Sequence, residues 1–577
     1  MKSSEVLTAV AQRRGCQTPE DIAEFLDPSP PIRNTFDTTV ADYPIARDRL
    51  ARAIARREPI TVFGDYDTDG VTSIAQIVRF LSIAGANVHW FVPHRVNDDG
   101  GMVYSALARC IAAHHPKLLI AVDCGSNSYE MISWLKKEGV DTIVLDHHSL
   151  TTTTPGALAH LNPKATAPGD PLSQVSASGL AFLFADKLAD ELGIRPQWER
   201  IRAGNLIMAG LGIVADMMPM LNINRALVKH SLTLANNPEE LRRLPGLVAL
   251  GEVAGAREIT EQTYTFHWAP RLNACGRMDD ATTAVQLLLS ASREEAAEHA
   301  RSCEAANNER IATQREVTLE AVANAHEVVS ARPDTKVIVL TGYAWHPGVS
   351  GIVAAKIKDT FLRPAFVLTW ADEGTGVDQG VWRGSGRGYP SFNLDLAVQK
   401  AVSLGIAQRG GGHPMSVGVR IHPSKLAEFR AFMDSECTAS LSSFTPTYEV
   451  LGHAESFGDR SAEVWHRVIT RLAPFGPGNP RPYVLARNSK LLRAPLPKRK
   501  EDHIFAVSGV FSVGAGASPL TVQFDWYDPQ CAFKTWSPNC AYDIVAAIDR
   551  RPQYDRTSVS NYNWRVAGCR PVQPTAA

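Results

Sequence analysis

The sequence of 577 residues lacks a long hydrophobic run, a sizeable net charge and any close pair of cysteines. Its longest apolar segment, residues 206–215, stops at Asp216, well short of the roughly 20 residues that a membrane-spanning helix needs. Residues 1–5 do not contain the apolar core of a signal peptide. We therefore expect a cytoplasmic protein with no membrane partner.

The nine cysteines are odd in number and never occur as Cys-x-x-Cys. This pattern argues against a disulfide framework or a zinc ribbon and favours a reducing compartment. With 59 basic and 60 acidic residues, the formal net charge is −1. That value counts against a passive coat for nucleic acid but is compatible with an enzyme whose basic groups line one cleft.

The length predicts about three domains, since single hydrophobic cores stop growing at roughly 250–300 residues. In the first half of the chain, helix-like segments alternate with four apolar runs, residues 60–63, 88–92, 118–122 and 142–145. Alternation of this kind predicts βαβ units and a parallel sheet.

The secondary-structure pattern of the sequence changes again in the second half of the chain. Residues 293–327 are charged and nearly free of helix breakers, which predicts a long connecting helix, and a second α/β pattern begins at residues 336–340. Short β-type segments beyond about residue 443 indicate a small barrel or a sandwich. The predicted organisation is a leader at 1–44, a catalytic domain at 45–290, the connecting helix at 291–330, a second α/β domain at 331–440 and a β-rich domain at 443–577.

Acids and histidines directly follow three of the predicted strands. They are Asp65, Asp67 and Asp69 after the first strand, Asp123 after the third, and Asp146, His147 and His148 after the fourth. The carboxyl ends of parallel strands share one edge of the sheet, where such folds bind ligands. Because unpaired buried charge is costly, this edge predicts a site for two divalent cations.

The first of these segments is a loop with three aspartates in alternation. In a turn their carboxylates can converge on one point, and Gly64 and Gly70 free the backbone to bend there. Oxygen ligands favour Mg²⁺ or Mn²⁺, and a histidine in the set leans towards Mn²⁺. The alternative is a helix–loop–helix calcium site, but that motif needs an acid where this chain has Gln76.

Two further aspartates need separate interpretation. Asp123 taken alone could be an ordinary helix cap or turn former. Asp216, at the end of the apolar segment 206–215, could supply an additional ligand. Two cations roughly 3.5–4 Å apart are the usual device for hydrolysing a phosphate ester, and they make a nucleophilic serine or cysteine unnecessary.

The motifs, taken together, resemble those of a known superfamily. Residues 64–70, 123–125, 146–148 and 215–216 resemble, in order, the four motifs of the DHH phosphoesterases. Within that superfamily, the RecJ exonucleases, which degrade single strands from the 5′ end, are similar at residues 93–95, 161–164, 270–277 and 345–353. Residues 384–387 and 410–413 resemble the associated DHHA1 domain, and residues 475–480 resemble the entry to an OB-type domain. The similarity covers roughly residues 15–570.

The resemblance implies an α/β fold and a role for each matching residue. The fold would contain a parallel-sheet DHH domain, the long connecting helix, an α/β DHHA1 domain and a C-terminal OB-like domain that binds nucleic acid. One ion would be held by Asp69, Asp123, His147 and Asp216, and the other by Asp65 and Asp67, with Asp123 bridging. His148 would lie beside the scissile phosphate. The substrate would be bound by Arg95, Arg271, Arg277, Ser385, Arg387 and His413, in keeping with the match between arginine and phosphate.

Some of these residues also have a plainer interpretation. Arg387 could be a solvated charge, Arg271 a structural ion-pair partner and His346 a satisfied turn histidine. Residues 498–500 could follow a phosphate backbone or form an ordinary basic loop. Aromatic residues of the last domain could stack on bases or belong to the core; they include Trp526, Tyr527 and Trp536.

The resemblance therefore predicts a metal-dependent 5′→3′ exodeoxyribonuclease in DNA repair or recombination. It would use two Mn²⁺ or Mg²⁺ ions and release 5′-mononucleotides from single-stranded DNA. We expect a monomer whose protein partners include a single-strand-binding protein or a helicase. The alternatives are a DHH phosphodiesterase for short oligonucleotides or cyclic dinucleotides, which usually lacks a third domain, and a non-catalytic relative like Cdc45, in which the metal motifs decay.

Overall fold

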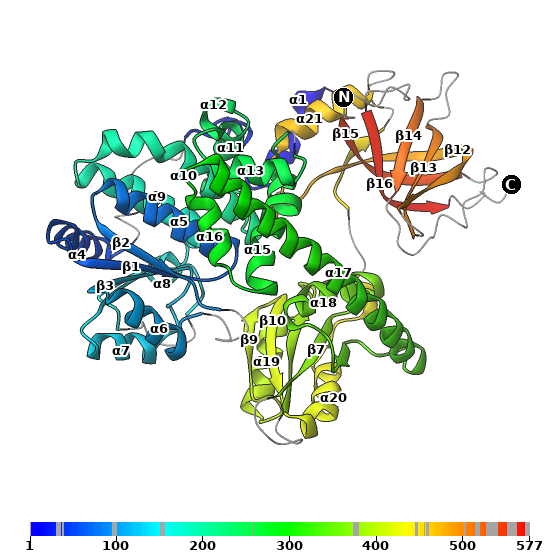
Figure 1. Ribbon diagram of the computed structural model, residues 1–577. Coiled ribbons are helices and arrows are strands. Elements are labelled where there is room, and N and C mark those ends of the chain that lie inside the picture. Colours follow the sequence, from blue (N-terminus) through cyan, green and yellow to red (C-terminus); the bar gives the residue numbers. More distant parts are fainter. Residues whose placement is uncertain are drawn as a thin grey trace. The chain divides into compact units, whose positions relative to one another are not determined.

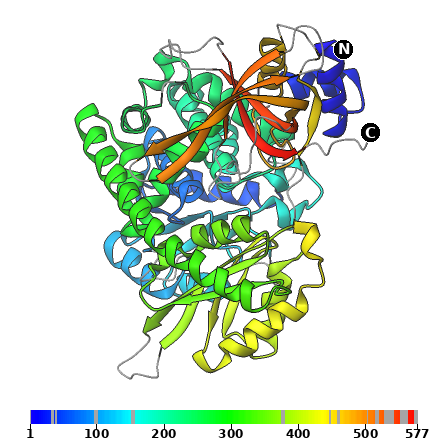
Figure 2. The same ribbon diagram turned by 90° about the vertical axis from the view of Figure 1, so that its right-hand side faces the viewer.

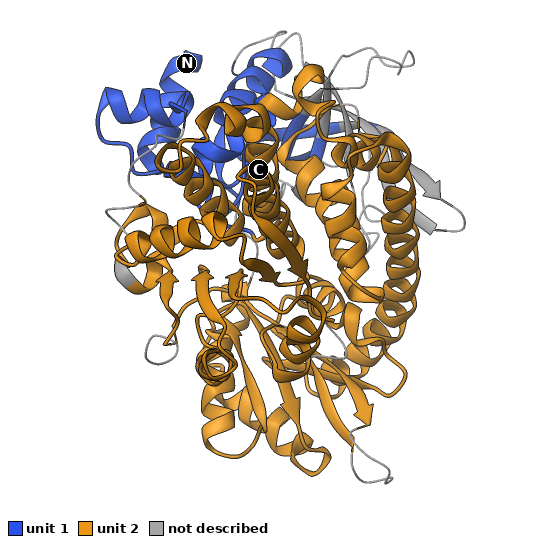
Figure 3. Cartoon of the chain, turned by 60° about the vertical axis from the view of Figure 1, so that its left-hand side comes forward, with its two compact units in different colours: residues 1–32, 217–233, 447–577 blue, residues 33–216, 234–446 orange. Residues whose placement is uncertain are grey.

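The computed structural model describes residues 2–30, 36, 40–94, 101–150, 156–256, 258–372, 380–444, 448–454, 456, 461–500, 503–513, 520–526, 541–550 and 562–571. The chain forms two compact units, coloured separately in Figure 3. The larger unit contains residues 33–216 and 234–446, and the smaller contains residues 1–32, 217–233 and 447–577. Among the described residues, no helix combines the length and apolar character needed to cross a membrane.

The larger unit begins with a five-stranded parallel sheet, drawn in blue and cyan in Figure 1. Its strands are β1 (Pro59–Gly64), β2 (Asn87–Phe91), β3 (Leu118–Val122), β4 (Asp141–Leu145) and β5 (Ala159–Leu161). They lie in the order β2-β1-β3-β4-β5. The four predicted strands are confirmed, and β5 adds a short fifth. The chain adds β2 on one side of β1 and then β3, β4 and β5 on the other side. Sheets of this kind bind ligands at such a switch point, which here lies between β1 and β3.

Helices cover both faces of this sheet. On one face, α6 (Tyr104–His114) and α7 (Tyr129–Lys137) share a core with Phe63, Leu119 and Val144. Next to β1, α5 (Thr68–Ile83) is buried along most of its length and lies beside α9 (Ala177–Glu191) and α10 (Arg195–Ala215). The remaining elements before the connecting helix are α4 (Tyr43–Ala55), α8 (Pro163–Thr166), η1 (Pro171–Gln174), α11 (Asn222–Ala235), α12 (Pro238–Leu241), α13 (Pro245–Val253), α14 (Glu261–Thr263), η2 (Tyr264–Trp268), α15 (Ala269–Met278) and α16 (Thr282–Leu289).

The predicted connecting helix is α17 (Arg293–Ala331), which Figures 1 and 2 show in green as one continuous helix. It leads into a second sheet with the order β6-β7-β8-β10-β9. These strands are β6 (Ile338–Gly342), β7 (Ala365–Asp372), β8 (Gly380–Arg387), β9 (Arg409–His413) and β10 (Ser416–Ile421). The α/β fold class predicted from the sequence is confirmed in both sheets.

The second sheet has two different faces because strand side chains alternate. One face, with Val339, Phe366 and Val417, packs on α19 (Leu394–Ser403) and α20 (Leu426–Glu436). The other face is covered by α17 and α18 (Ser350–Phe361) over β6 and β7. Over β8, β10 and β9 this second face instead carries polar residues and glycines. The polar half is where the predicted DHHA1 residues lie.

The smaller unit contains a barrel. Its strands are β11 (Val450–His453), β12 (Tyr483–Lys500), β13 (His503–Val513), β14 (Leu520–Trp526), β15 (Ala541–Arg550) and β16 (Tyr562–Pro571). The order is β11-β12-β13-β14-β16-β15, and an additional pairing of β12 with β15 closes five of the strands on themselves. Of the two predicted architectures, a barrel or a sandwich, the structure shows the barrel. An OB fold also has five strands.

The N-terminal helices belong to this unit. Helix α1 (Ser3–Arg13) and helix α2 (Pro19–Leu26) share one buried core with α21 (Ser461–Leu472) and barrel strands β12 and β15. Arg225 links α2 to the segment after α21. Its guanidinium donates to the carbonyl oxygens of Phe25 (2.6 Å), Pro474 (3.1 Å) and Ala473 (2.9 Å). The prediction of a leader at residues 1–44 did not include a shared core between these helices and the barrel.

Candidate metal centre

The loop between β1 and α5 divides its three aspartates between two groups. Asp67 caps α5, because its Oδ1 accepts the N–H groups of Asp69 at 3.0 Å and Gly70 at 3.1 Å. The Asp69 carboxylate turns the other way and accepts the N–H groups of Ala177 (2.9 Å) and Ser178 (3.1 Å). The three carboxylates therefore do not meet at one point, as a turn would have allowed, because two helix N-termini fix them in different directions. The separation of Asp69 from Asp65 and Asp67 matches the two ligand sets that the resemblance implies.

Gly70 permits the tight approach in this loop. A Cβ atom at this position would lie 2.3 Å from the backbone oxygen of Asp65, closer than real Cβ atoms come to any atom. Gly70 is thus required by close packing and not by a positive φ. It keeps the loop folded back on itself so that Asp65 and Asp67 face the same way.

The end of β3 delivers Asp123 in a strained conformation. Its φ is +58°, in the left-handed region that non-glycine residues seldom adopt. Its N–H is held by the Leu145 carbonyl at 3.1 Å, and its side chain is buried. The carboxylate lies within 4.8 Å of ligand atoms of Asp65 and Asp67, and in a second group within that limit of Asp146, His147 and His148.

The end of β4 presents the two histidines. Asp146 is buried, and its carboxylate accepts the N–H groups of Ser126 (3.0 Å), His147 (2.7 Å) and His148 (3.2 Å). The same carboxylate lies 2.8 Å from His148 Nδ1. Burial would raise the pKa of Asp146, but the charge of His148 and these hydrogen bonds outweigh it and lower the pKa. Asp146 therefore positions the histidine pair.

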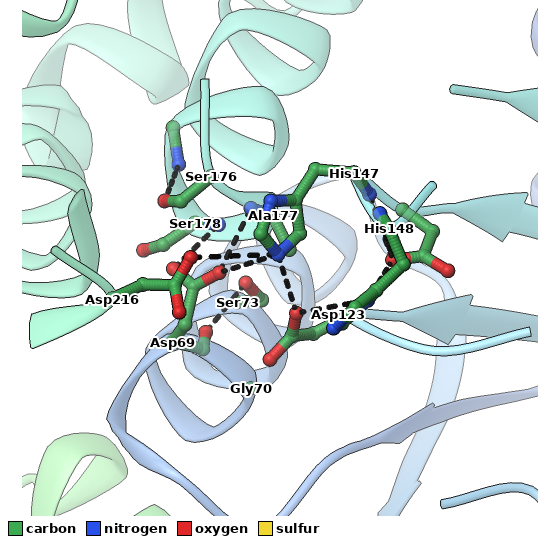
Figure 4. A network of polar contacts seen from close by, with 12 residues as sticks. Asp69, Gly70, Ser73, Asp123, His147, His148, Ser176, Ala177, Ser178 and Asp216 are labelled. Atoms are coloured by element: carbon green, nitrogen blue, oxygen red, sulfur yellow. Dashed lines mark hydrogen bonds and ion pairs between the residues drawn. The ribbon is translucent and has the colours of Figure 1, made fainter. Parts of the chain in front are cut away.

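Around His147 the structure brings together three carboxylates (Figure 4). The Nε2 atom lies 3.2 Å from Asp123 Oδ1, 3.6 Å from Asp216 Oδ2 and 3.8 Å from Asp69 Oδ2. These residues come from the ends of β4, β3 and α10 and the first turn of α5. The predicted ligands of the first ion are therefore neighbours, and Asp65, Asp67 and Asp123 form the second predicted group.

The arrangement fits divalent cations better than it fits the free side chains. One imidazole nitrogen can donate a single proton, yet Nε2 faces three carboxylates. Oδ1 of Asp123 is buried and accepts no hydrogen bond within the described part of the chain. An unsatisfied buried charge of this kind is costly, and a hard cation bound by oxygens and one imidazole would satisfy it.

The electrostatics lead to the same conclusion. Burial and the charge of Asp67 raise the pKa of Asp69 to about 7. Burial with Asp69 and Asp67 raises the pKa of Asp216 to about 8, and burial with the neighbouring carboxylates also raises the pKa of Asp123. Burial lowers the pKa of His147, which keeps its imidazole neutral as a ligand requires.

His148 has a different electrostatic environment from His147. The charge of Asp146 raises the pKa of His148 to about 9. The ring lies 6.2 Å from that of His413, centroid to centroid and stacked at 24°. Burial and the positive charge of His148 lower the pKa of His413. A half-exposed imidazolium next to the acid cluster suits contact with an anionic substrate.

Two other predicted substrate residues, Arg277 on α15 and Arg387 on β8, donate hydrogen bonds to backbone carbonyls. Arg277 Nη1 donates to the Gly348 carbonyl at 3.0 Å, and Arg387 Nη1 donates to the Gly386 carbonyl at 2.8 Å. A Cβ at Gly351 would approach Arg387 Nη2 to 2.6 Å, so a larger residue there would displace this guanidinium. Ser385 and Gly348 both line a cavity of about 480 Å³.

Two sequence-based interpretations take the plainer form, and several others cannot be compared with the structure. Arg271 forms an ion pair with Glu304 and donates to the His267 carbonyl, which matches the structural alternative. His346 caps a short helix by accepting the Gly348 N–H at 3.1 Å. Outside the described residues lie Arg95, Tyr527, Trp536 and the side chains of residues 498–500 and Trp526.

Two residues within the resembling motifs, Asn273 and Asn162, support the centre although the sequence assigned them no role. Asn273 Oδ1 accepts the Thr68 N–H at 2.8 Å and so ties α15 to the start of α5. Asn162 Nδ2 donates to Ser126 Oγ and to the His148 carbonyl, both at 2.8 Å. The signal for these residues was their membership of motifs, which gives no indication of which atom they hold.

Comparisons with known proteins place this geometry in a family. The DHH family N-terminal domain matches residues 59–211 and the DHHA1 domain matches residues 334–439. The single-stranded-DNA-specific exonuclease RecJ of Thermus thermophilus is 30% identical over 525 residues, which cover 87% of this chain and 70% of that protein. The chain belongs to the RecJ family.

Other RecJ proteins agree with this assignment. RecJ of Bacillus subtilis is 33% identical over 456 residues, covering 77% of this chain but 54% of that protein, so the chain matches about half of that relative's length. A crystal structure of T. thermophilus RecJ with Mn²⁺ shares the fold, with a TM-score of 0.77 over 99% of this chain and 76% of that one at 24% identity. A RecJ crystal structure bound to manganese is 29% identical, with a TM-score of 0.57 over 70% of this chain and 95% of that one.

Proposed function

We propose that this protein is a single-stranded-DNA-specific exonuclease that hydrolyses phosphodiester bonds from the 5′ end and releases 5′-mononucleotides. The observation that carries the proposal is the ring of Asp69, Asp123 and Asp216 around His147 Nε2, at 3.2–3.8 Å. Membership of the RecJ family supports the choice of substrate.

The ligands of the proposed centre fall into two sets. Asp69, Asp123, His147 and Asp216 would hold one ion, and Asp65 with Asp67 would hold the second with Asp123 between them. Two Mn²⁺ or Mg²⁺ ions bound there would supply an activated water and neutralise charge on the phosphate. Relatives crystallised with Mn²⁺ and with Mg²⁺ support this choice of metal.

The protein's own groups would orient the substrate. His148, with its Nδ1 held by Asp146, would contact the scissile phosphate through the rest of its ring. Arg277, Ser385 and Arg387 would bind the 5′-terminal phosphate, because guanidinium groups and hydroxyls match phosphate oxygens. His413, stacked on His148, would limit the room beside the reacting group. The barrel of the smaller unit would bind the incoming strand, as OB-type barrels do.

The wider predictions belong to the same proposal. We infer a role in DNA repair or recombination, in the cytoplasm, by a monomer that works with a single-strand-binding protein or a helicase. Free thiols at Cys110, Cys124 and Cys437 among the described residues support a reducing compartment.

The decisive experiment uses single-stranded and double-stranded DNA labelled at either end. With Mn²⁺ or Mg²⁺ the single strand should lose nucleotides stepwise from its 5′ end, while duplex DNA and samples with chelator stay intact. Asp69→Ala and Asp123→Ala should abolish the reaction with little change in circular dichroism. Full activity in either purified variant, or hydrolysis of dinucleotides alone, would contradict the proposal.

A further inference from the structure

Three arginines cross the polar half of the second sheet at one level. In the register of the sheet, Arg420 on β10 pairs with Arg383 on β8 and with Arg409 on β9. We call Arg383, Arg420 and Arg409 the arginine row. Their positions on neighbouring strands bring three cationic side chains to adjacent places on one face.

The arginine row shares this face with the predicted phosphate residues. Arg383, Ser385 and Arg387 alternate along β8 and therefore point to the same side. The row lies four residues from the level of Arg387, Ser416 and His413, which pair across the same three strands. At roughly 3.3 Å per residue the two levels are about 13 Å apart.

The arginine row lines a cavity that reaches the metal loop at Tyr66. It has a volume of about 480 Å³ and is lined by the whole row and by Ser385 and Gly348. Tyr66, which lies between Asp65 and Asp67 in the metal loop, also lines it. Its floor contains Gly411 and Gly418, and a Cβ at Gly418 would meet nothing within 4 Å. The space above the floor is therefore open to a ligand.

The arginine row places like charges opposite one another on neighbouring strands. Like charges directly opposite one another on neighbouring strands destabilise the pairing. Arginine is, however, the side chain that best matches phosphate, because its planar fork donates two parallel hydrogen bonds. A row of three arginines that lines an open cavity beside the metal loop suits an anionic ligand.

We propose that the arginine row is a second phosphate-binding site, distinct from the one that would hold the terminal 5′ phosphate. This inference rests on the proposed function. The shared chemistry is a phosphate oxyanion, which could belong to an internal linkage of the strand or to the outer phosphates of a 5′-triphosphate end. Either source would hold the DNA in register while its end is cut.

The test measures DNA binding by the full-length protein without turnover. Fluorescence anisotropy in chelator gives Kd for a 5′-phosphorylated thymidine 12-mer as a function of salt. Arg409→Gln and Arg420→Gln should each raise Kd about tenfold at low salt and reduce the slope of log Kd against log salt by about 0.7. The matched control is Arg332→Gln, an exposed arginine on the C-cap of α17 outside the cavity, which should leave both quantities unchanged.

Two further arms identify the source of the phosphate. If the arginine row binds an internal linkage, the glutamine variants should bind a 5′-phosphorylated hexamer more weakly than the wild type but a 5′-phosphorylated dimer equally well. If the row binds the outer phosphates of a triphosphate end, the variants should bind only a 5′-triphosphorylated dimer more weakly. If the variants bind all of these ligands as the wild type does, the second site does not exist.

Melting temperatures separate a binding role from a structural one. Arg409→Gln should melt at the wild-type temperature or above it, because Arg409 is exposed and a like-charge contact has been removed. Gly418→Ala, which adds a methyl group to the open floor, should weaken binding without lowering the melting temperature. Variants that melt several degrees lower and bind normally would overturn the proposal. A wild-type protein that neither binds nor degrades single strands would instead overturn the proposed function.

Discussion

Oδ1 of Asp146 lies 2.8 Å from Nδ1 of His148 and also accepts the N–H groups of His147 and His148. One buried carboxylate therefore fixes both histidines of the predicted centre. The neighbouring His147 then faces the carboxylates with Nε2 while His148 stays half-exposed. The two imidazoles thus differ in environment although they are adjacent in sequence.

Replacing this carboxylate should impair hydrolysis without removing a metal ligand. In Asp146→Asn we expect a loss of about 10-fold to 100-fold in kcat/KM, as for other groups that orient ligands. The pKa of His148 should fall from about 9 towards its usual value, because Asp146 is the main cause of its elevation. NMR titration of His148 and the pH profile of kcat measure both effects.

The matched control is the exposed Asp334→Asn, which should change neither quantity. An Asp146→Asn protein with wild-type kinetics and an unshifted His148 would show that the carboxylate only shapes the turn.

The metal-free protein should lose stability as the pH rises. Asp69 and Asp216 have pKa values raised to about 7 and about 8 in the folded protein, against about 3.9 when unfolded. A raised folded-state pKa gives stability that is present below pH 4 and lost as the pH passes through 7 and 8. The melting temperature in chelator should therefore fall between about pH 4 and pH 8.

Mn²⁺ should reduce this fall, because the cation stabilises the ionised carboxylates. At 100 times its Kd, a bound ion adds about 2.7 kcal/mol of stability. Asp216→Asn should melt higher than the wild type at pH 8 in chelator and gain less from Mn²⁺. Identical pH profiles with and without metal would mean that no cation binds in this cluster.

Two arginines of α15 should behave differently on substitution. Arg271 is paired with Glu304, so Arg271→Gln should lower the free energy of unfolding by about 1–2 kcal/mol with a small effect on kcat. Arg277→Gln should mainly raise KM for DNA that carries a 5′ phosphate. Urea unfolding and steady-state kinetics on phosphorylated and unphosphorylated strands separate the two effects.

A double-mutant cycle of Arg271→Gln with Glu304→Gln gives the coupling of the ion pair. A cycle without coupling, together with a raised KM in Arg271→Gln, would favour the substrate-binding interpretation of Arg271.

The metal loop should not tolerate a methyl group at Gly70. Gly70→Ala would bring Cβ to 2.3 Å from the Asp65 oxygen, and overpacking of this kind costs about 1–3 kcal/mol. Displacement of Asp65 should also weaken binding of the second ion, which isothermal titration with Mn²⁺ would detect. Gly169→Ala is the control, since its Cβ would meet nothing within 4 Å.

The predicted elements of the first sheet are confirmed because their signals are local. Apolar runs of four or five residues, such as Leu118–Val122, alternate with amphipathic helices, and this pattern alone specifies βαβ units. The motifs also identified the residues around His147, because acids at the ends of parallel strands must share one edge of the sheet. The spacing of Asp65, Asp67 and Asp69 could not by itself divide them between two groups, because their directions depend on the Ala177 and Ser178 N–H groups of a distant helix; only the resemblance implied that division.

By itself the sequence determined the fold class, the long helix α17 and the membership of the acidic cluster, since periodicity and motif order express them directly. The tertiary structure alone decided the pairing of Arg271 with Glu304, the packing of α1 and α2 with the barrel, and the alignment of Arg383, Arg420 and Arg409 across three strands. Each of these depends on segments that are far apart in the chain or on strand register. Local composition does not encode such contacts, because the energy that selects them comes from packing of the whole unit.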